Sequence, residues 1–101
     1  MLGFALIASL ALQTSGGELS YWFCAGRTKD GTTVISEIVS TRGEIYRKEK
    51  FYERIDKKGV TVSPWTLRCP SSFEPDNVTR LRNEIIEQAR SGPGIITIRM
   101  K

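Results

Sequence analysis

Two cysteines, Cys24 and Cys69, are the sequence feature that most limits how this chain can fold. The chain has 101 residues, enough for one small domain, and a domain of this size gains considerably from a covalent cross-link. With two cysteines the connectivity is fixed if the pair is oxidised. Because disulfides persist in oxidising compartments, the role of the cysteines depends on whether the chain is exported.

The beginning of the chain is typical of an export signal. An uncharged run from Leu2 to Leu12 is followed by small residues, and it is too short for a membrane span, which needs about 20 residues. We therefore predict a signal peptide over residues 1–17 and a single domain without a membrane span over residues 18–101. No basic residue precedes the apolar run, and the alternative is a buried N-terminal element of the domain itself.

Other roles for Cys24 agree less well with its neighbours. Large aromatic residues, Tyr21 to Phe23, precede it, whereas a lipid-anchor signal has small residues there. A reactive thiolate favours an electropositive, partly exposed site, and aromatic neighbours indicate burial instead. We expect a structural Cys24–Cys69 disulfide that stabilises the fold by about 4 kcal/mol on the chain-entropy model. The alternative is two buried thiols in a cytosolic protein.

The hydrophobic patterning predicts strands and helices in the order β-β-α-β-α-β. Residues 21–27 and 32–41 are rich in aromatic and β-branched residues, and an Asp30-Gly31 turn signal separates them, which predicts a β-hairpin. Residues 60–69 return to a β-type composition, with Pro64 marking an edge position or a bulge. The chain end alternates apolar and polar residues as a half-buried strand does, with Ile96, Ile98 and Met100 on one side.

Two stretches are predicted to be helical. A short amphipathic helix is expected over about 46–57, where a third long strand is the alternative. A longer helix begins near Pro75 and ends at Gly92-Pro93-Gly94. Its apolar residues fall on one stripe at helical spacing: Val78, Leu81, Ile85, Ile86 and Ala89. Its other face is polar: Arg80, Arg82, Asn83, Glu84, Glu87 and Arg90. We expect a small single α+β domain with a mostly antiparallel sheet, both helices packed on one face, and one disulfide.

The sequence lacks the residue sets of common catalytic and metal sites. It contains no histidine, which excludes Ser-His and Cys-His pairs, and its two cysteines are too far apart for a paired zinc ligand set. No glycine-rich phosphate loop is present. A hydrolase built on two carboxylates stays open, but its candidates lie among lysines and arginines, as surface residues do: Glu37, Glu44, Glu53 and Glu84. We expect a protein that is not an enzyme and needs no cofactor or metal.

The chain is mildly basic, with a net charge of +4 at pH 7, which permits an anionic partner without requiring one. Basic and aromatic residues interleave over residues 46–58, a pattern that can bind a nucleic acid strand or another polyanion. Acidic residues are mixed in, which favours a salt-bridged surface helix whose aromatic residues face the core. The basic residues of the segment are Arg47, Lys48, Lys50, Arg54, Lys57 and Lys58.

These features predict a small exported domain, periplasmic or secreted, that is non-catalytic and binds or modulates a protein partner. Polyanion or nucleic-acid binding through residues 46–58 is the alternative. Trp22 and Trp65 are expected in the core or on a sheet face rather than in a ligand platform. The expected contact surfaces are the sheet face that no helix covers and the Pro64–Trp65 loop, so Trp65 joins the six basic residues as a candidate binding residue.

Overall fold

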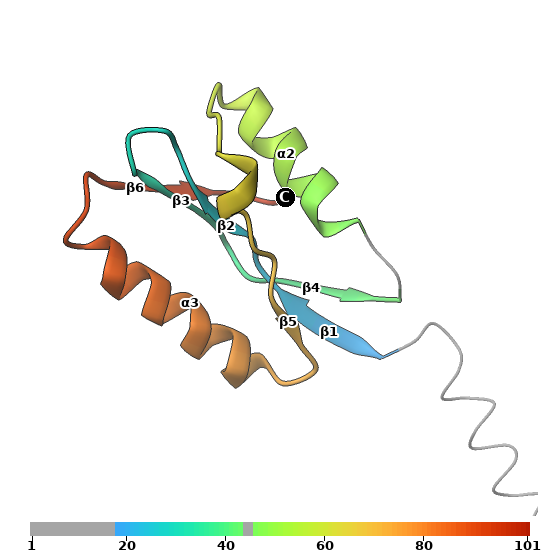
Figure 1. Ribbon diagram of the computed structural model, residues 1–101. Helices are drawn as coiled ribbons and strands as arrows, with labels where there is room; N and C mark the ends of the chain where they lie inside the picture. The colour runs from blue at the N-terminus through green and yellow to red at the C-terminus, as the bar shows by residue number, and fades with distance from the viewer. Residues whose placement is uncertain (1–17, 44–45) are drawn as a thin grey trace, which may run out of the picture.

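The computed structural model describes residues 18–43 and 46–101 (Figure 1). The elements in chain order are β1 (Leu19–Trp22), β2 (Ala25–Arg27), β3 (Thr33–Ser36), β4 (Val39–Arg42), α2 (Arg47–Lys57), the 3-10 turn η1 (Pro64–Thr66), β5 (Ser71–Ser72), α3 (Pro75–Ala89) and β6 (Ile95–Ile98). With β1–β2 and β3–β4 each counted as one long strand, this is the predicted α+β order. The predicted signal peptide, residues 1–17, lies outside the described residues.

The strands form two three-stranded sheets, with the orders β4-β1-β5 and β2-β3-β6. The two sheets share two long chain segments, because β1 continues into β2 and β3 continues into β4. All strand pairings are antiparallel except that of β3 with β6, which is parallel. The predicted hairpin is therefore confirmed, and each of its two arms passes through both sheets.

The hairpin turns between Thr28 and Thr32. Gly31 donates its N–H to the Thr28 carbonyl at 3.0 Å and has a φ of 92°, a left-handed conformation that glycine adopts without steric cost. The Asp30 carboxylate accepts hydrogen bonds from the Thr28 hydroxyl and, at 3.2 Å, from the Thr32 N–H. The hydrogen bond from Thr28 is the main reason that the pKa of Asp30 lies below its usual value. Asp30 is therefore ionised at neutral pH, the form that accepts these bonds.

A β-bulge separates the two halves of the hairpin. Between the pairs Ala25–Ile35 and Trp22–Val39, the first arm has two residues and the second arm has three. The buried hydroxyl of Ser36 accepts a hydrogen bond from a backbone N–H of the first arm at 2.9 Å and donates one to the next carbonyl of its own arm at 2.9 Å. These bonds satisfy backbone groups where the ladder is interrupted, and the bulge divides the strands into two sheets.

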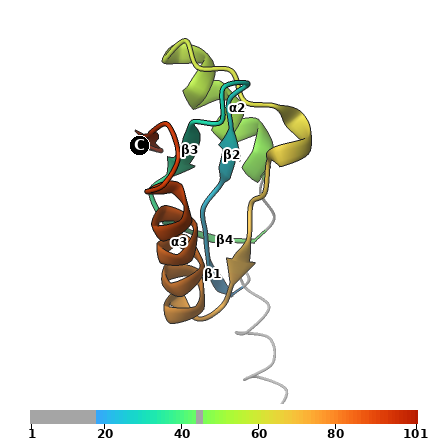
Figure 2. The ribbon, with the colours of Figure 1, turned by 60° about the vertical axis from the view of Figure 1, so that its left-hand side comes forward.

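Successive residues of the first arm alternate between two hydrophobic cores. Trp22 and Cys24 pack in the cluster that contains helix α2, whereas Phe23 and Ala25 pack in the cluster that contains helix α3. The two helices therefore lie on opposite sides of the strands (Figures 1 and 2). The prediction that both helices cover one face is wrong. Because the first arm is apolar on both sides, each side has to be covered.

Both predicted helices are present. Helix α2 buries Phe51 and Ile55, which lie four residues apart on one side of the helix. Helix α3 begins at Pro75, as predicted, and its apolar stripe faces the sheet, with Val78 and Ala89 buried. The remaining members of the stripe are half-buried against the same core: Leu81, Ile85 and Ile86. The final strand also follows its predicted pattern, because its alternate apolar residues all join the α2-side core: Ile96, Ile98 and Met100.

Residues 60–69 do not form the predicted strand. Pro64 begins the turn η1, so its prediction as an edge position or bulge is wrong, and the strand β5 comes only at Ser71–Ser72. The physical reason is a close crossing over Gly26. A Cβ atom at Gly26 would lie 2.4 Å from Cγ1 of Val62, so the chain at Val62 packs across the strand, and antiparallel pairing along it begins only at Arg68.

The predicted Cys24–Cys69 disulfide is present. The isolated bridge Ala25–Arg68 and the β1–β5 pairs share one antiparallel register, in which Cys24 and Cys69 stand directly opposite each other. Their Cα atoms are 4.1 Å apart, close to the spacing of a non-hydrogen-bonded antiparallel pair. The disulfide therefore links the first arm of the hairpin to the edge segment that contains β5.

We expect the double variant Cys24→Ala, Cys69→Ala to lose about 4 kcal/mol of unfolding free energy, because the cross-link closes a loop of 45 residues. Urea unfolding followed by tryptophan fluorescence would measure the loss. A reductant should destabilise the wild type by a similar amount and leave the double variant unchanged. A loss near zero would show that the disulfide contributes nothing to the stability of the fold.

The close crossing at Gly26 gives a second stability test. We expect Gly26→Ala to cost about 1–3 kcal/mol, because the added methyl group overlaps Val62. The matched control is Gly94→Ala, where the nearest heavy atom to an added Cβ is 3.9 Å away. Val62→Ala should cost less stability in the Gly26→Ala background than in the wild type, because it removes the group that the added methyl overlaps. Equal melting temperatures for the two single variants would contradict the close crossing.

Candidate functional site

Trp65 is the most exposed of the large hydrophobic side chains that the structure describes, at 77% of its possible surface. It lies in the turn η1, between Pro64 and Thr66. The prediction that both tryptophans lie in the core or on a sheet face holds for Trp22, which is fully buried and donates its Nε1–H to the Thr41 hydroxyl at 3.3 Å. For Trp65 that prediction is wrong.

Hydrogen bonds fix the turn that carries Trp65 to strand β2. The Ser63 N–H donates to the Arg27 carbonyl at 2.8 Å, and the Arg27 N–H donates to the Thr66 hydroxyl at 2.9 Å. The same hydroxyl donates back to the Ser63 carbonyl at 2.7 Å. Val62 and Leu67, on either side of the turn, are both buried in the α2-side core. Trp65 is therefore presented to solvent by a backbone that is anchored at both ends.

The predicted basic residues lie on helix α2 and on the residue that follows it. Four of them are spaced three, four and three positions apart and so follow one side of the helix: Arg47, Lys50, Arg54 and Lys57. We call these four residues the basic stripe. Lys48 lies on another side of the helix, and Lys58 donates from Nζ to the Thr97 carbonyl at 3.4 Å.

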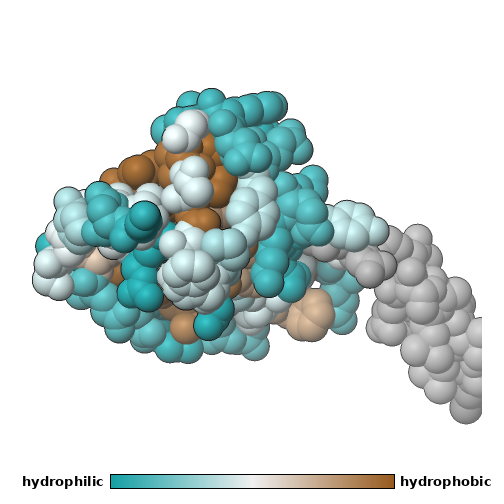
Figure 3. Space-filling view, turned by 45° about the horizontal axis from the view of Figure 1, so that its top comes forward, coloured by the Kyte–Doolittle hydropathy of each residue, from teal (hydrophilic) through white to brown (hydrophobic). Residues whose placement is uncertain are grey.

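Acidic residues stand beside the basic stripe rather than within it: Glu49, Glu53 and Asp56. Lys57 and Glu53 form an ion pair at 3.6 Å. Hydrophilic side chains gather at the top of the space-filling view, over α2 (Figure 3). The expectation that the aromatic residues face the core holds for Phe51, which is buried, and in part for Tyr52, whereas Tyr46 is 68% exposed. The structure thus groups four of the six predicted cations.

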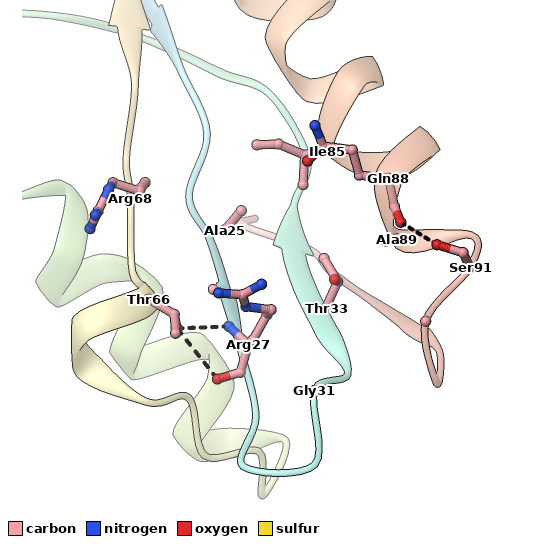
Figure 4. Close-up of a pocket in the computed structure, with 12 residues that line it drawn as sticks. Ala25, Arg27, Gly31, Thr33, Thr66, Arg68, Ile85, Gln88, Ala89 and Ser91 are labelled. Carbon is pink, nitrogen blue, oxygen red and sulfur yellow. Dashed lines mark hydrogen bonds between the residues drawn. The ribbon is translucent and has the colours of Figure 1, made fainter.

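A pocket opens where helix α3 ends above strands β2 and β3 (Figure 4). Its volume is about 290 Å³, near the lower limit for small-ligand sites. Ala25 and Thr33 line it from the strands, and Ile85 and Ala89 line it from α3. Thr66, which anchors the Trp65 turn, lines it from the edge segment. The pocket and the exposed tryptophan are therefore neighbours through Thr66.

The charged groups of the pocket are two arginines, and none of the described residues that line it is acidic. Arg27 has its guanidinium over the strands near Ala25 (Figure 4). Arg68 has its guanidinium turned away from Ala25, and its Nη1 donates to the carbonyls of Trp65 at 3.4 Å and of Leu67 at 3.0 Å. Neither arginine belongs to a recognisable motif in the sequence.

The candidate carboxylates of a hydrolase are dispersed. Glu37 accepts the Met100 N–H at 2.9 Å, Glu53 pairs with Lys57, and Glu84 pairs with Arg80 at 3.3 Å. Glu44 lies outside the described residues. Within residues 18–43 and 46–101, no group of three or more His, Cys, Asp or Glu side chains is placed to hold a metal ion.

Arg82 has a structural role that the sequence analysis missed. It was assigned to the polar face of α3, but it is half-buried, and its Nε donates to the Ser36 carbonyl at 2.8 Å. The signal was in the spacing, since Arg82 follows Val78 by four residues and precedes Ile85 by three, on the side that faces the sheet. This bond connects α3 to the bulge of the hairpin.

Comparison with protein-family models, with curated proteins and with solved structures finds no match for this chain. Among the residues that the structure describes, no helix is both long and apolar enough to cross a membrane.

Proposed function

We propose that this protein is a non-catalytic binding domain that recognises a protein partner through the turn that presents Trp65. The observation that carries the proposal is the 77% exposure of this tryptophan on a turn that is hydrogen-bonded to β2 at both ends. Tryptophan is among the residues most enriched where the binding energy of protein interfaces concentrates.

The rigidity of the turn favours a binding role. A side chain on a mobile loop loses conformational freedom when a partner binds, and that loss weakens the affinity. The bonds from Ser63 and Thr66 to Arg27 order the backbone of Trp65 in advance. Arg68 lies next to the turn, and arginine accompanies tryptophan in many binding hot spots.

The proposal includes export to the periplasm or the exterior. The Cys24–Cys69 disulfide is of the kind that persists in oxidising compartments. The uncharged run from Leu2 to Leu12 supplies an export signal in the sequence. An intact mass of the protein from its native host, measured before and after reduction, tests both parts, since it reports the cleavage and the disulfide. A full-length mass with two free thiols would overturn the export proposal.

We expect Trp65→Ala to weaken the affinity for the protein partner by about 30-fold or more, because truncating a central aromatic anchor costs about 2 kcal/mol or more. The wild-type domain, immobilised, would retain the partner from the exported protein fraction of the host. Binding of the purified partner to each variant would then be measured by calorimetry.

The matched control for this experiment is Phe73→Ala, which removes another exposed aromatic side chain, 66% accessible, from the loop before α3. It should leave the affinity within about twofold, as most contacts outside a hot spot do. The exposed Trp65 contributes little to packing, so the melting temperature of its variant should match that of the wild type. Equal affinities for the wild type and Trp65→Ala would refute the proposed role of the turn.

A second candidate function, polyanion binding, is favoured by the basic stripe on α2. Four cations follow one side of the helix over a rise of about 15 Å, and within the described residues Lys57 is the member of the stripe that forms an ion pair, with Glu53. A row of cations of this kind can contact an extended anionic chain such as nucleic acid or a sulfated polysaccharide.

Retention on immobilised heparin tests the basic stripe. We expect the double variant Lys50→Gln, Lys57→Gln to elute at a lower salt concentration than the control Lys29→Gln, Lys48→Gln, which removes the same charge from exposed positions outside the stripe. Elution should shift steeply with salt, because each phosphate or sulfate contact releases counterions. If the wild type is not retained at low salt, the second candidate function is excluded.

A further inference from the structure

We infer that the pocket between α3 and β2 receives a glutamate side chain of the protein partner that docks on the Trp65 turn. The identity of the ligand as part of that partner rests on the proposed function, whereas the preference for a carboxylate rests on the pocket alone. Four observations carry the inference: the charge of the lining, the availability of Arg27, the apolar walls, and the connection to the Trp65 turn.

The first observation is the one-sided charge of the lining. Arg27 and Arg68 border the pocket, the guanidinium of Arg68 being turned away from Ala25, and no aspartate or glutamate is among the described residues that line it. A guanidinium binds a carboxylate through two parallel hydrogen bonds, which gives both strength and direction. The pocket therefore attracts a carboxylate more strongly than a neutral or cationic group.

The second observation is the state of Arg27. Its backbone is fixed, because its N–H and C=O both take part in the hydrogen bonds of the turn. Its side chain is exposed, and within the described part of the chain its guanidinium belongs to none of the three ion pairs. A ligand carboxylate can therefore bind Arg27 without first breaking an internal ion pair.

The end of α3 also argues against a cation as the ligand. A helix C-terminus attracts cations through its unpaired carbonyls. Here the Gln88 carbonyl accepts the Ser91 hydroxyl at 3.2 Å (Figure 4), and the Ala89 carbonyl accepts the Gly92 N–H at 3.0 Å. The carbonyls at this edge of the pocket are thus occupied locally, and Arg27 supplies the charged group over the strands.

The third observation is the apolar part of the lining, which selects the kind of carboxylate. Ala25, Ile85 and Ala89 form a hydrocarbon surface beside Arg27. The two methylene groups of a glutamate side chain would contact this surface while the carboxylate reaches the guanidinium. A small inorganic anion would make no use of these walls.

The fourth observation joins the pocket to the Trp65 turn. Thr66 lines the pocket and anchors the turn, and Arg68, which also borders the pocket, turns its guanidinium away from Ala25 and donates to the Trp65 carbonyl at 3.4 Å. One segment of a partner can therefore contact the indole of Trp65 and place a glutamate in the pocket. The two features then form a single recognition surface.

The test uses a blocked dipeptide, acetyl-leucyl-glutamyl-amide, and its neutral match, acetyl-leucyl-glutaminyl-amide. Each would be titrated into the ¹⁵N-labelled protein and followed by NMR. We expect the glutamyl peptide to shift the amide signals of Gly26, Thr33 and Ser91, and the glutaminyl peptide to shift them far less. Arg27→Gln should weaken binding of the glutamyl peptide about tenfold or more, because it removes a charge-assisted hydrogen bond.

The matched control is Lys48→Gln, which removes one positive charge from helix α2, away from the pocket. It should leave the affinity for the glutamyl peptide unchanged. Unshifted signals of α2 residues in Arg27→Gln would show that this variant is folded. The inference is overturned if both peptides shift the pocket signals equally, or if Arg27→Gln binds the glutamyl peptide as the wild type does.

Acetate provides a further arm that distinguishes a partner side chain from a free small anion. If acetate binds the pocket as tightly as the glutamyl peptide, the assignment to a partner side chain is wrong. The two proposals can fail separately. If the glutamyl peptide binds at Arg27 but the affinity of the partner does not depend on Trp65, the carboxylate site stands and the proposed role of the Trp65 turn is refuted. If the affinity of the partner depends on Trp65 but no carboxylate binds at Arg27, the role of the turn stands and the carboxylate site is refuted.

Discussion

The Cys24–Cys69 disulfide joins the first arm of the hairpin to the edge segment that bears Trp65 and two of the pocket residues, Thr66 and Arg68. Hydrogen bonds to Ala25 and Arg27 also hold this segment, but it has little regular strand structure. Its strand β5 is two residues long, and a single isolated bridge at Arg68 precedes it. Pro70, between them, has no N–H to donate, although its carbonyl accepts the Phe23 N–H at 3.4 Å. The covalent bond therefore fixes the register that places the edge segment beside Arg27.

The position of the pocket follows from where α3 ends. The first arm of the hairpin is apolar on both sides, so it needs a helix on each side. Helix α3 covers Phe23 and Ala25 but ends at Ala89, before Gly92-Pro93-Gly94. The strands continue past that point, to Arg27 and Thr33. The helix therefore does not cover the last strand residues on this face, and their side chains line an open pocket.

The sequence predicts those elements whose signals are local. The Asp30-Gly31 turn, the apolar stripe of α3 and the alternating final strand each depend on neighbouring residues, and all three are correct. Exposure of Trp65 could not be predicted in this way, because it depends on a crossing between Val62 and Gly26, which are distant in the sequence. The same holds for the pocket, whose lining comes from the hairpin, the edge segment and α3. The placement of the two helices could have been predicted, because residues 21–25 are apolar on both sides of the strand, so each side needs a covering helix.

The disulfide and the pocket lie on opposite faces of the same two strands. Cys24 and Cys69 face the core with α2, while the adjacent pair, Ala25 and Arg68, faces the other side and borders the pocket. A cross-link on one face thus sets the distance between pocket residues on the other face without occupying the site. Reduction would remove the covalent link between the edge segment and the hairpin, while the hydrogen bonds that Ala25 and Arg27 make to this segment would remain. A structural disulfide of this kind supports the proposal that the protein works in an oxidising compartment.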